Sequence, residues 1–132
     1  MSKAKNTFPK ISRPLEYVAF LNFKVNTKEG PAFFFLACDG FTEYAFNISV
    51  EQNENTESIL KSVYLLTEHP KFVKHMSNGF TLVFDRFEEI STNIESILKT
   101  VNGKFLLDKK FHKKISAPVV SSFSQFLSNQ SR

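Results

Sequence analysis

The residues of this chain that could do metal-ion chemistry are its few aspartates and the glutamates near them. The aspartates are Asp39, Asp85 and Asp108, and Asp85 is soon followed by Glu88 and Glu89. Carboxylates that converge on one point hold divalent ions, and a pair of such ions can clamp the attacking and leaving oxygens of a phosphodiester. Asp85 also directly precedes an arginine, so a surface ion pair of little energetic weight is the competing interpretation.

Other kinds of chemistry find little support. The three histidines, His69, His75 and His112, have no ligand-like spacing, and the single cysteine, Cys38, lies in an apolar run where a buried, unreactive thiol is expected. The chain has no Gly-x-Ser-x-Gly motif, and its four glycines are too scattered for a phosphate-binding loop. We therefore expect neither a bound metal nor a cofactor.

A basic segment, 104–114, is the strongest candidate for a binding surface. Its basic side chains are Lys104, Lys109, Lys110, His112, Lys113 and Lys114. Lysines gathered on one face would give salt-sensitive, sequence-independent affinity for nucleic-acid phosphates. The alternative is an edge strand that its lysines protect from aggregation. The segment thus predicts either a contact with DNA or a charged sheet edge.

Apolar patterning defines the elements that must position these residues. A mostly aromatic and branched run at 15–25 and a continuous apolar run at 32–39 predict two strands covered on both faces, and alternation over 44–50 predicts a half-exposed third strand. Short turns between them indicate an antiparallel meander.

The pattern then changes to alternating helices and strands. The predicted elements are a helix capped by Asn55 or Thr56 and ending before Pro70, a strand at 80–84, a helix opened by a capping box of Thr92 and Glu95, a strand at 105–111, and a last helix capped by Ser116.

Length and composition indicate a single domain. A chain of 132 residues with 42% apolar residues can bury one core, and its formal charge of +4 permits contact with an anionic partner. We expect a mobile basic arm over 1–14, one domain over 15–128 and a frayed tail over 129–132. No stretch is long and apolar enough to suggest a membrane span, and the one cysteine suits a reducing cytoplasm.

The order β-β-β-α-β-α-β-α and two local motifs resemble the catalytic core of DDE integrases and transposases. The segment 35–44 (FLACDGFTEY) resembles their second strand and the turn after it, and 120–123 (VSSF) resembles the start of their glutamate-bearing helix. The resemblance implies a ribonuclease H-like fold, an α/β fold in which a mixed five-stranded sheet carries helices on both faces.

The same resemblance implies what has been lost. Such cores hold two metal ions between two aspartates and a glutamate; here the second aspartate would be Asp85, the first would fall near Leu21 and Asn22, and the glutamate would fall on Ser121. One carboxylate in three is too few for two-metal catalysis. We therefore expect a degenerate core that is not an enzyme and that contacts DNA non-specifically through Lys104, Lys109, Lys110, Lys113 and Lys114.

Two other functions remain open at this stage. The chain could be a small protein-interaction or scaffold domain, through a protein partner or self-association, with no role in nucleic-acid binding. It could also keep a residual nuclease activity that uses Asp85 together with Glu88 or Glu89. No membrane partner is expected.

Overall fold

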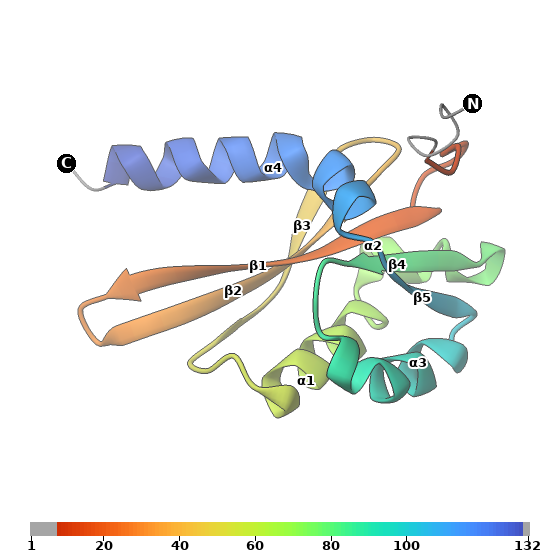
Figure 1. Ribbon diagram of the computed structural model, residues 1–132, viewed down its shortest axis with the longest axis horizontal. Coiled ribbons are helices and arrows are strands. Elements are labelled where there is room, and N and C mark those ends of the chain that lie inside the picture. The colour runs from red at the N-terminus through yellow and green to blue at the C-terminus, as the bar shows by residue number, and fades with distance from the viewer. Residues whose placement is uncertain (1–7, 131–132) are drawn as a thin grey trace, which may run out of the picture.

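A mixed five-stranded sheet forms the centre of the computed structural model, which describes residues 8–130 and the side chains of residues 8–123. The strand order is β3-β2-β1-β4-β5 (Figure 1). The strands are β1 (Tyr17–Thr27), β2 (Gly30–Asp39), β3 (Ala45–Glu51), β4 (Phe80–Phe84) and β5 (Gly103–Leu107). The first three strands form an antiparallel meander, and β1, β4 and β5 run parallel to one another. The predicted α/β class and mixed sheet are confirmed.

Helices cover both faces of this sheet. They are α1 (Thr56–Leu66), the short α2 (Pro70–Val73), α3 (Ser91–Lys99) and α4 (Lys109–Gln130). Figure 1 shows α1 and α3 on one face and α4 on the other, running along β1 and β2. The sheet is therefore the middle of three layers.

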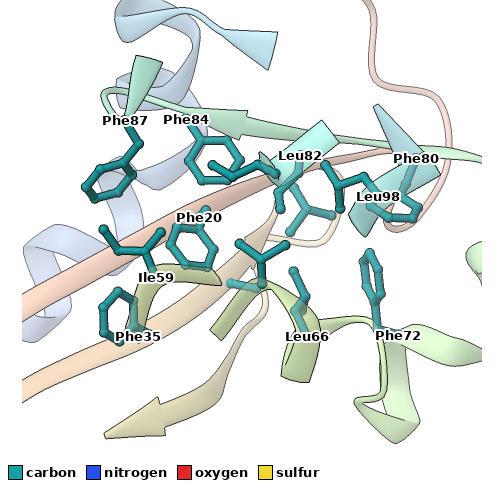
Figure 2. Packing of buried hydrophobic residues seen from close by; sticks show 14 of the residues in the cluster. Phe20, Phe35, Ile59, Leu66, Phe72, Phe80, Leu82, Phe84, Phe87 and Leu98 are labelled. Carbon is teal, nitrogen blue, oxygen red and sulfur yellow. The ribbon is translucent and has the colours of Figure 1, made fainter. Parts of the chain in front are cut away.

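This layering explains the continuous apolar runs of the central strands. Successive side chains of a strand point to opposite faces, so both sets must be apolar when both faces are covered. Phe20, Phe35 and Phe84 face α1 and α3 in the larger core, which Figure 2 shows from close by. Leu21 and Cys38 face α4, in a second core that contains Phe111 and Ile115 among others.

The β1–β2 hairpin extends beyond the rest of the sheet. It is paired as far as Thr27 and Gly30, whereas β1 pairs with β4 only over Tyr17 to Ala19. The later part of α4 lies along this extension (Figure 1), and the ring of Phe123 stacks on that of Phe23 with centroids 4.1 Å apart. The far end of β1 is consequently covered by α4 on one face and has no β4 beside it.

Residues 8–14 pack onto the domain, contrary to the prediction of a mobile arm up to residue 14. The ring of Phe8 stacks on Phe111 at 5.4 Å, and Nη2 of Arg13 donates to the carbonyl oxygens of Asn78 and Gly79, both at 2.9 Å. Of the predicted arm and tail, residues 1–7 and 131–132 lie outside the described residues, and α4 includes 129–130.

The two predicted helix starts in the middle of the chain have opposite outcomes. Asn55 caps α1 as predicted: its side chain accepts from the backbone N–H of Ser58 at 2.9 Å, and Ser58 caps in return. The predicted capping box of Thr92 and Glu95 is wrong. Helix α3 continues directly from a 3₁₀ turn over Glu88–Ile90 and has no side-chain cap, because the preceding turn already supplies its first hydrogen bonds.

The start of the last helix is also corrected. Strand β5 ends at Leu107, and Asp108 caps α4, since its side chain accepts from the backbone N–H of Phe111 at 3.0 Å. Ser116, the predicted cap, is instead buried inside this helix, and Pro118 also lies in its interior. The basic segment therefore passes from the edge strand β5, which carries Lys104, into the first turns of α4, which carry the other basic side chains.

Candidate functional site

A hollow of about 540 Å³ opens between the middle of β1, the end of β4 and the first turns of α4. In open α/β sheets, ligands bind at the carboxyl ends of parallel strands, and this hollow lies at that end of β4. Its lining residues are Leu21, Asn22, Phe23, Asp85, Arg86, Lys109, His112, Lys113, Ser116 and Val120.

The turn after β4 places an arginine beside the one aspartate of the hollow. Nε of Arg86 lies 3.7 Å from Oδ1 of Asp85, and its Nη2 lies 3.6 Å from Oε2 of Glu54. Nη2 also donates to Oδ1 of Asn22, whose own amide donates to Glu54. Asp85 and Asn22 are thus engaged with a guanidinium group.

Phe87 fixes the direction of this turn. Its backbone is left-handed (φ 79°), an uncommon conformation for a bulky residue, and its side chain is buried in the larger core beside Phe84 (Figure 2). The guanidinium carbon of Arg86 lies 5.2 Å from the centre of the Phe87 ring. Burial of Phe87 therefore sends the neighbouring Arg86 outward over the hollow.

Of the residues expected to mark lost carboxylates, Leu21 and Asn22 line the hollow together with Asp85, and Ser121 does not. The parallel register pairs Ala19 with Val83, so continuing it by two residues brings Leu21 level with Asp85. Leu21 packs against α4, whereas Asn22 binds Arg86. Ser121 is exposed and does not line the hollow; Ser116 and Val120 do.

The remaining acidic candidates do not reach the hollow either. Asp108 caps α4, and Glu88 and Glu89 are exposed in the 3₁₀ turn. Within residues 8–130, no three His, Cys, Asp or Glu side chains come together as a set that could hold a metal ion.

The structure divides the five predicted lysines among different surfaces. Lys109 and Lys113, one helical turn apart, line the hollow, and Lys110 does not. Lys114 lines a separate depression with Phe8 and Lys10, and Lys104 lies at the opposite, amino-terminal end of the parallel strands. The predicted single basic face is therefore wrong in detail: two of the five lysines share the hollow with Arg86.

His112 contributes a ring of defined orientation to the wall of the hollow. It is buried, and its Nε2 lies 2.8 Å from the carbonyl oxygen of Phe20. Because a carbonyl oxygen can only accept, Nε2 of His112 is the donor in this contact.

Arg86 and Glu54 are the residues of this region that sequence reasoning missed. In the sequence Arg86 stands out only as a partner of Asp85, and Glu54 gives no signal, because it approaches from the loop before α1, far away in sequence. One available signal was the Asp-Lys-Lys-Phe sequence at 108–111. Reading it as a helix start would have placed Lys109 and Lys113 on one face.

The other strand-ending aspartate, Asp39, has a structural role. Its carboxylate is buried and accepts from the N–H groups of Leu15 (2.8 Å) and Phe41 (3.0 Å) and from N and Oγ1 of Thr42 (3.4 and 2.8 Å). Neighbouring Cys38 is fully buried, and burial raises the pKa of its thiol to about 12. Both residues therefore serve the core and the turn after β2.

Comparison with known proteins identifies the fold. A chain of the simian T-cell lymphotropic virus intasome, in complex with the PP2A regulatory subunit B56 gamma, is similar over 93% of this chain (TM-score 0.62, 8% identity). Two structures of the HTLV-2 integrase catalytic core domain in complex with magnesium are similar over 88% of it, with TM-scores of 0.55 (trimeric form, 10% identity) and 0.51 (dimeric form, 11% identity). The fold is ribonuclease H-like.

The similarity is one of structure and not of sequence. No family model matches the chain, and no curated protein matches it in sequence. The chain spans 45% of the intasome chain, and 76% and 74% of the dimeric and trimeric HTLV-2 integrase cores. Among the described residues, no helix has the length and apolar character needed to cross a membrane.

Proposed function

We propose that this chain is a non-catalytic domain of integrase-core-like fold that binds the DNA backbone. The observation that carries the proposal is the cationic lining of the hollow at the end of β4, where Arg86, Lys109 and Lys113 are accompanied by one carboxylate, Asp85. The fold supports an evolutionary link to enzymes that act on DNA, and the side chains of this chain support a different use of the same surface.

Loss of catalysis follows from the chemistry of the hollow. Two-metal phosphoryl transfer needs several carboxylates to neutralise and position two divalent ions. The HTLV-2 integrase cores carry magnesium, whereas here Leu21 stands level with Asp85 and contributes an apolar side chain. Arg86 is held beside Asp85 at 3.7 Å, and a fixed cation at this distance opposes binding of a second cation to the same carboxylate.

DNA binding follows from the placement of the basic side chains on α4. Lys109, Lys110, Lys113 and Lys114 are all exposed in its first two turns, and no acidic side chain of the described residues pairs with them. Ammonium groups gathered in this way bind phosphates by displacing condensed counterions, without reading sequence.

The test is fluorescence anisotropy with labelled duplex and branched DNA. If about four phosphates are contacted, affinity should fall about 100-fold between roughly 50 and 200 mM salt. The variant with the four lysines of α4 (Lys109, Lys110, Lys113, Lys114) changed to Gln should lose binding. A control of equal charge changes Lys24, Lys28, Lys74 and Lys99 to Gln, and should retain most of it.

Equal loss in both lysine variants would mean that net charge, and not this surface, causes binding. A nuclease assay with Mg²⁺ or Mn²⁺ completes the test. Metal-dependent cleavage that disappears in Asp85→Asn would contradict the non-catalytic assignment and restore the residual nuclease as the better hypothesis.

A second candidate, a protein-interaction domain, is favoured by one specific observation. Phe41 and Tyr44 flank the turn after β2 with 49% and 50% of their surface exposed, and large exposed aromatic side chains are enriched at protein interfaces. One structural neighbour is itself assembled with a protein, the PP2A subunit B56 gamma. Sedimentation of the wild type and of a Phe41→Ser, Tyr44→Ser variant tests self-association through this patch.

A further inference from the structure

We propose that the hollow between β1, the end of β4 and α4 is a metal-independent site for a single phosphate group. This inference goes beyond backbone binding, because its occupant is one tetrahedral oxyanion that either a nucleic acid or a free phosphate compound could supply. Three cationic side chains hold it: Arg86 from the turn after β4, and Lys109 and Lys113 from α4.

The balance of charge in the hollow favours an anion. Of its lining residues, Arg86, Lys109 and Lys113 are cationic and Asp85 alone is anionic. Arg86 is paired with Asp85 and Glu54, but neither Lys109 nor Lys113 has an acidic partner among residues 8–123. Two uncompensated ammonium groups therefore face a concave surface, where low-dielectric walls strengthen their field.

Arg86 is oriented for recognition and retains donors. Its ion pairs and its hydrogen bond to Asn22 involve Nε and Nη2, which leaves the two N–H donors of Nη1 without a partner in the described part of the chain. The guanidinium group is planar and always charged, and it suits the geometry of phosphate oxygens. The contacts to Asp85 and Glu54 hold the group in place, so little side-chain entropy is lost when an anion binds.

The opposite wall is equally well defined. Lys109 and Lys113 are four residues apart on a helix, so their side chains lie one above the other on the same face. They stand in the first two turns of α4, where the positive end of the helix dipole also favours an anion. Buried His112 anchors this wall to β1 through its 2.8 Å contact with the carbonyl oxygen of Phe20.

The size of the hollow indicates a phosphate that is attached to a larger group. About 540 Å³ falls within the range of pockets that hold small organic ligands and exceeds what one oxyanion fills. Phe23 and Val120 add apolar surface beside the cations. A nucleotide or the end of a phosphorylated nucleic acid fits these properties, as does any phosphomonoester with a compact organic part.

The helix itself supplies a matched pair of variants. Lys109→Gln with Lys113→Gln removes both ammonium groups from the hollow, whereas Lys110→Gln with Lys114→Gln removes two charges of the same spacing from the same helix outside it. All four side chains are exposed, so both variants should fold like the wild type, which circular dichroism checks.

The experiment is titration of the ¹⁵N-labelled protein with inorganic phosphate, a nucleoside monophosphate and a 5′-phosphorylated oligonucleotide, each with EDTA and with Mg²⁺. We expect shifts centred on Arg86, Lys109 and Lys113 with EDTA present, unchanged by Mg²⁺. If each lysine contributes about a tenfold factor, as charge-assisted contacts can, Lys109→Gln with Lys113→Gln should weaken the binding of inorganic phosphate about 100-fold, and the control by less than about threefold.

Three results would overturn the site: no shifts with any of the three phosphates, equal weakening in both double variants, or a requirement for Mg²⁺. The comparison of ligands separates a free phosphate compound from a nucleic acid as the natural source. Binding of inorganic phosphate by a protein that fails to bind duplex DNA would overturn the proposed function and leave this site standing. DNA binding that both double variants weaken equally would support the proposed function and overturn this site.

Discussion

Replacing Asp39 should destabilise this protein far more than replacing Asp85, although both aspartates end a strand. Asp39 is only 2% exposed, and its carboxylate accepts four hydrogen bonds, from Leu15, Phe41 and Thr42. Asp39→Ala removes all four acceptors and leaves the buried N–H of Leu15 without a partner.

The size of the effect follows from these contacts. A hydrogen bond to a charged group contributes about 1.5 to 3 kcal/mol net, and a buried donor left unpaired costs about 1 to 3 kcal/mol. The four bonds share one carboxylate and are not additive, so we expect Asp39→Ala to lower the free energy of unfolding by about 3 to 5 kcal/mol. For a domain of this size that corresponds to a fall in Tm of roughly 10 to 20 °C.

Asp39→Asn refines the prediction. An amide can keep one oxygen as acceptor for Leu15 and Phe41, but its NH₂ group then meets the backbone N–H of Thr42. The expected loss is about 1 to 2 kcal/mol. Asp85→Ala is the control: its side chain is 43% exposed and its partner lies 3.7 Å away, so the loss should stay below about 0.5 kcal/mol.

Urea unfolding followed by circular dichroism measures all three variants. A loss below about 1 kcal/mol for Asp39→Ala would refute the reasoning, because water would then have replaced the carboxylate without cost. An equal loss for Asp39→Ala and Asp39→Asn would attribute the effect to charge and not to the individual hydrogen bonds.

Three further predictions concern the core and the last helix. Gly103→Ala should lower the free energy of unfolding, measured with urea, by about 1 to 3 kcal/mol, because an added Cβ would lie 2.3 Å from Cζ of Phe80. An unchanged free energy of unfolding would show that the ring moves away freely. Cys38 should react with a thiol reagent at pH 8 only as fast as the protein unfolds. Its pKa in the folded protein, about 12, exceeds the ordinary value of 9.0, so above about pH 9 the thiol loses its proton only in the unfolded chain. The free energy of unfolding should therefore fall as pH rises above about 9. Fast labelling of the folded protein would contradict its burial. Pro118→Ala should raise the free energy of unfolding by about 1 to 3 kcal/mol by restoring a helical hydrogen bond, as thermal unfolding would show; a loss would mean that the proline ring packs usefully.

The sequence by itself determined most of the architecture. The runs that become β1, β2 and β4 are largely apolar on successive residues, as strands covered on both faces require. Asn55 is a cap whose hydrogen bonds are made within four residues, so local sequence fixes the start of α1. The element order then leads to a ribonuclease H-like sheet, which the structure confirms.

Local patterns failed where two interpretations fit the same residues equally well. Ser116 before Pro118 has the sequence of a helix start, but Asp108 is an equally good cap. Packing of Phe111 and Ile115 under β1 favours the earlier start. Likewise, Thr92 and Glu95 form a capping sequence that the 3₁₀ turn before α3 makes unnecessary.

The candidate site depended on tertiary structure. Which lysines share the hollow follows from the start of α4, and the position of Arg86 follows from burial of Phe87 and from Glu54, which lies far from it in the sequence. A chain segment can specify its own caps and its own apolar face, because those interactions are local. It cannot specify which charge from another segment will stand opposite, because only packing of the whole sheet and its helices brings the two together.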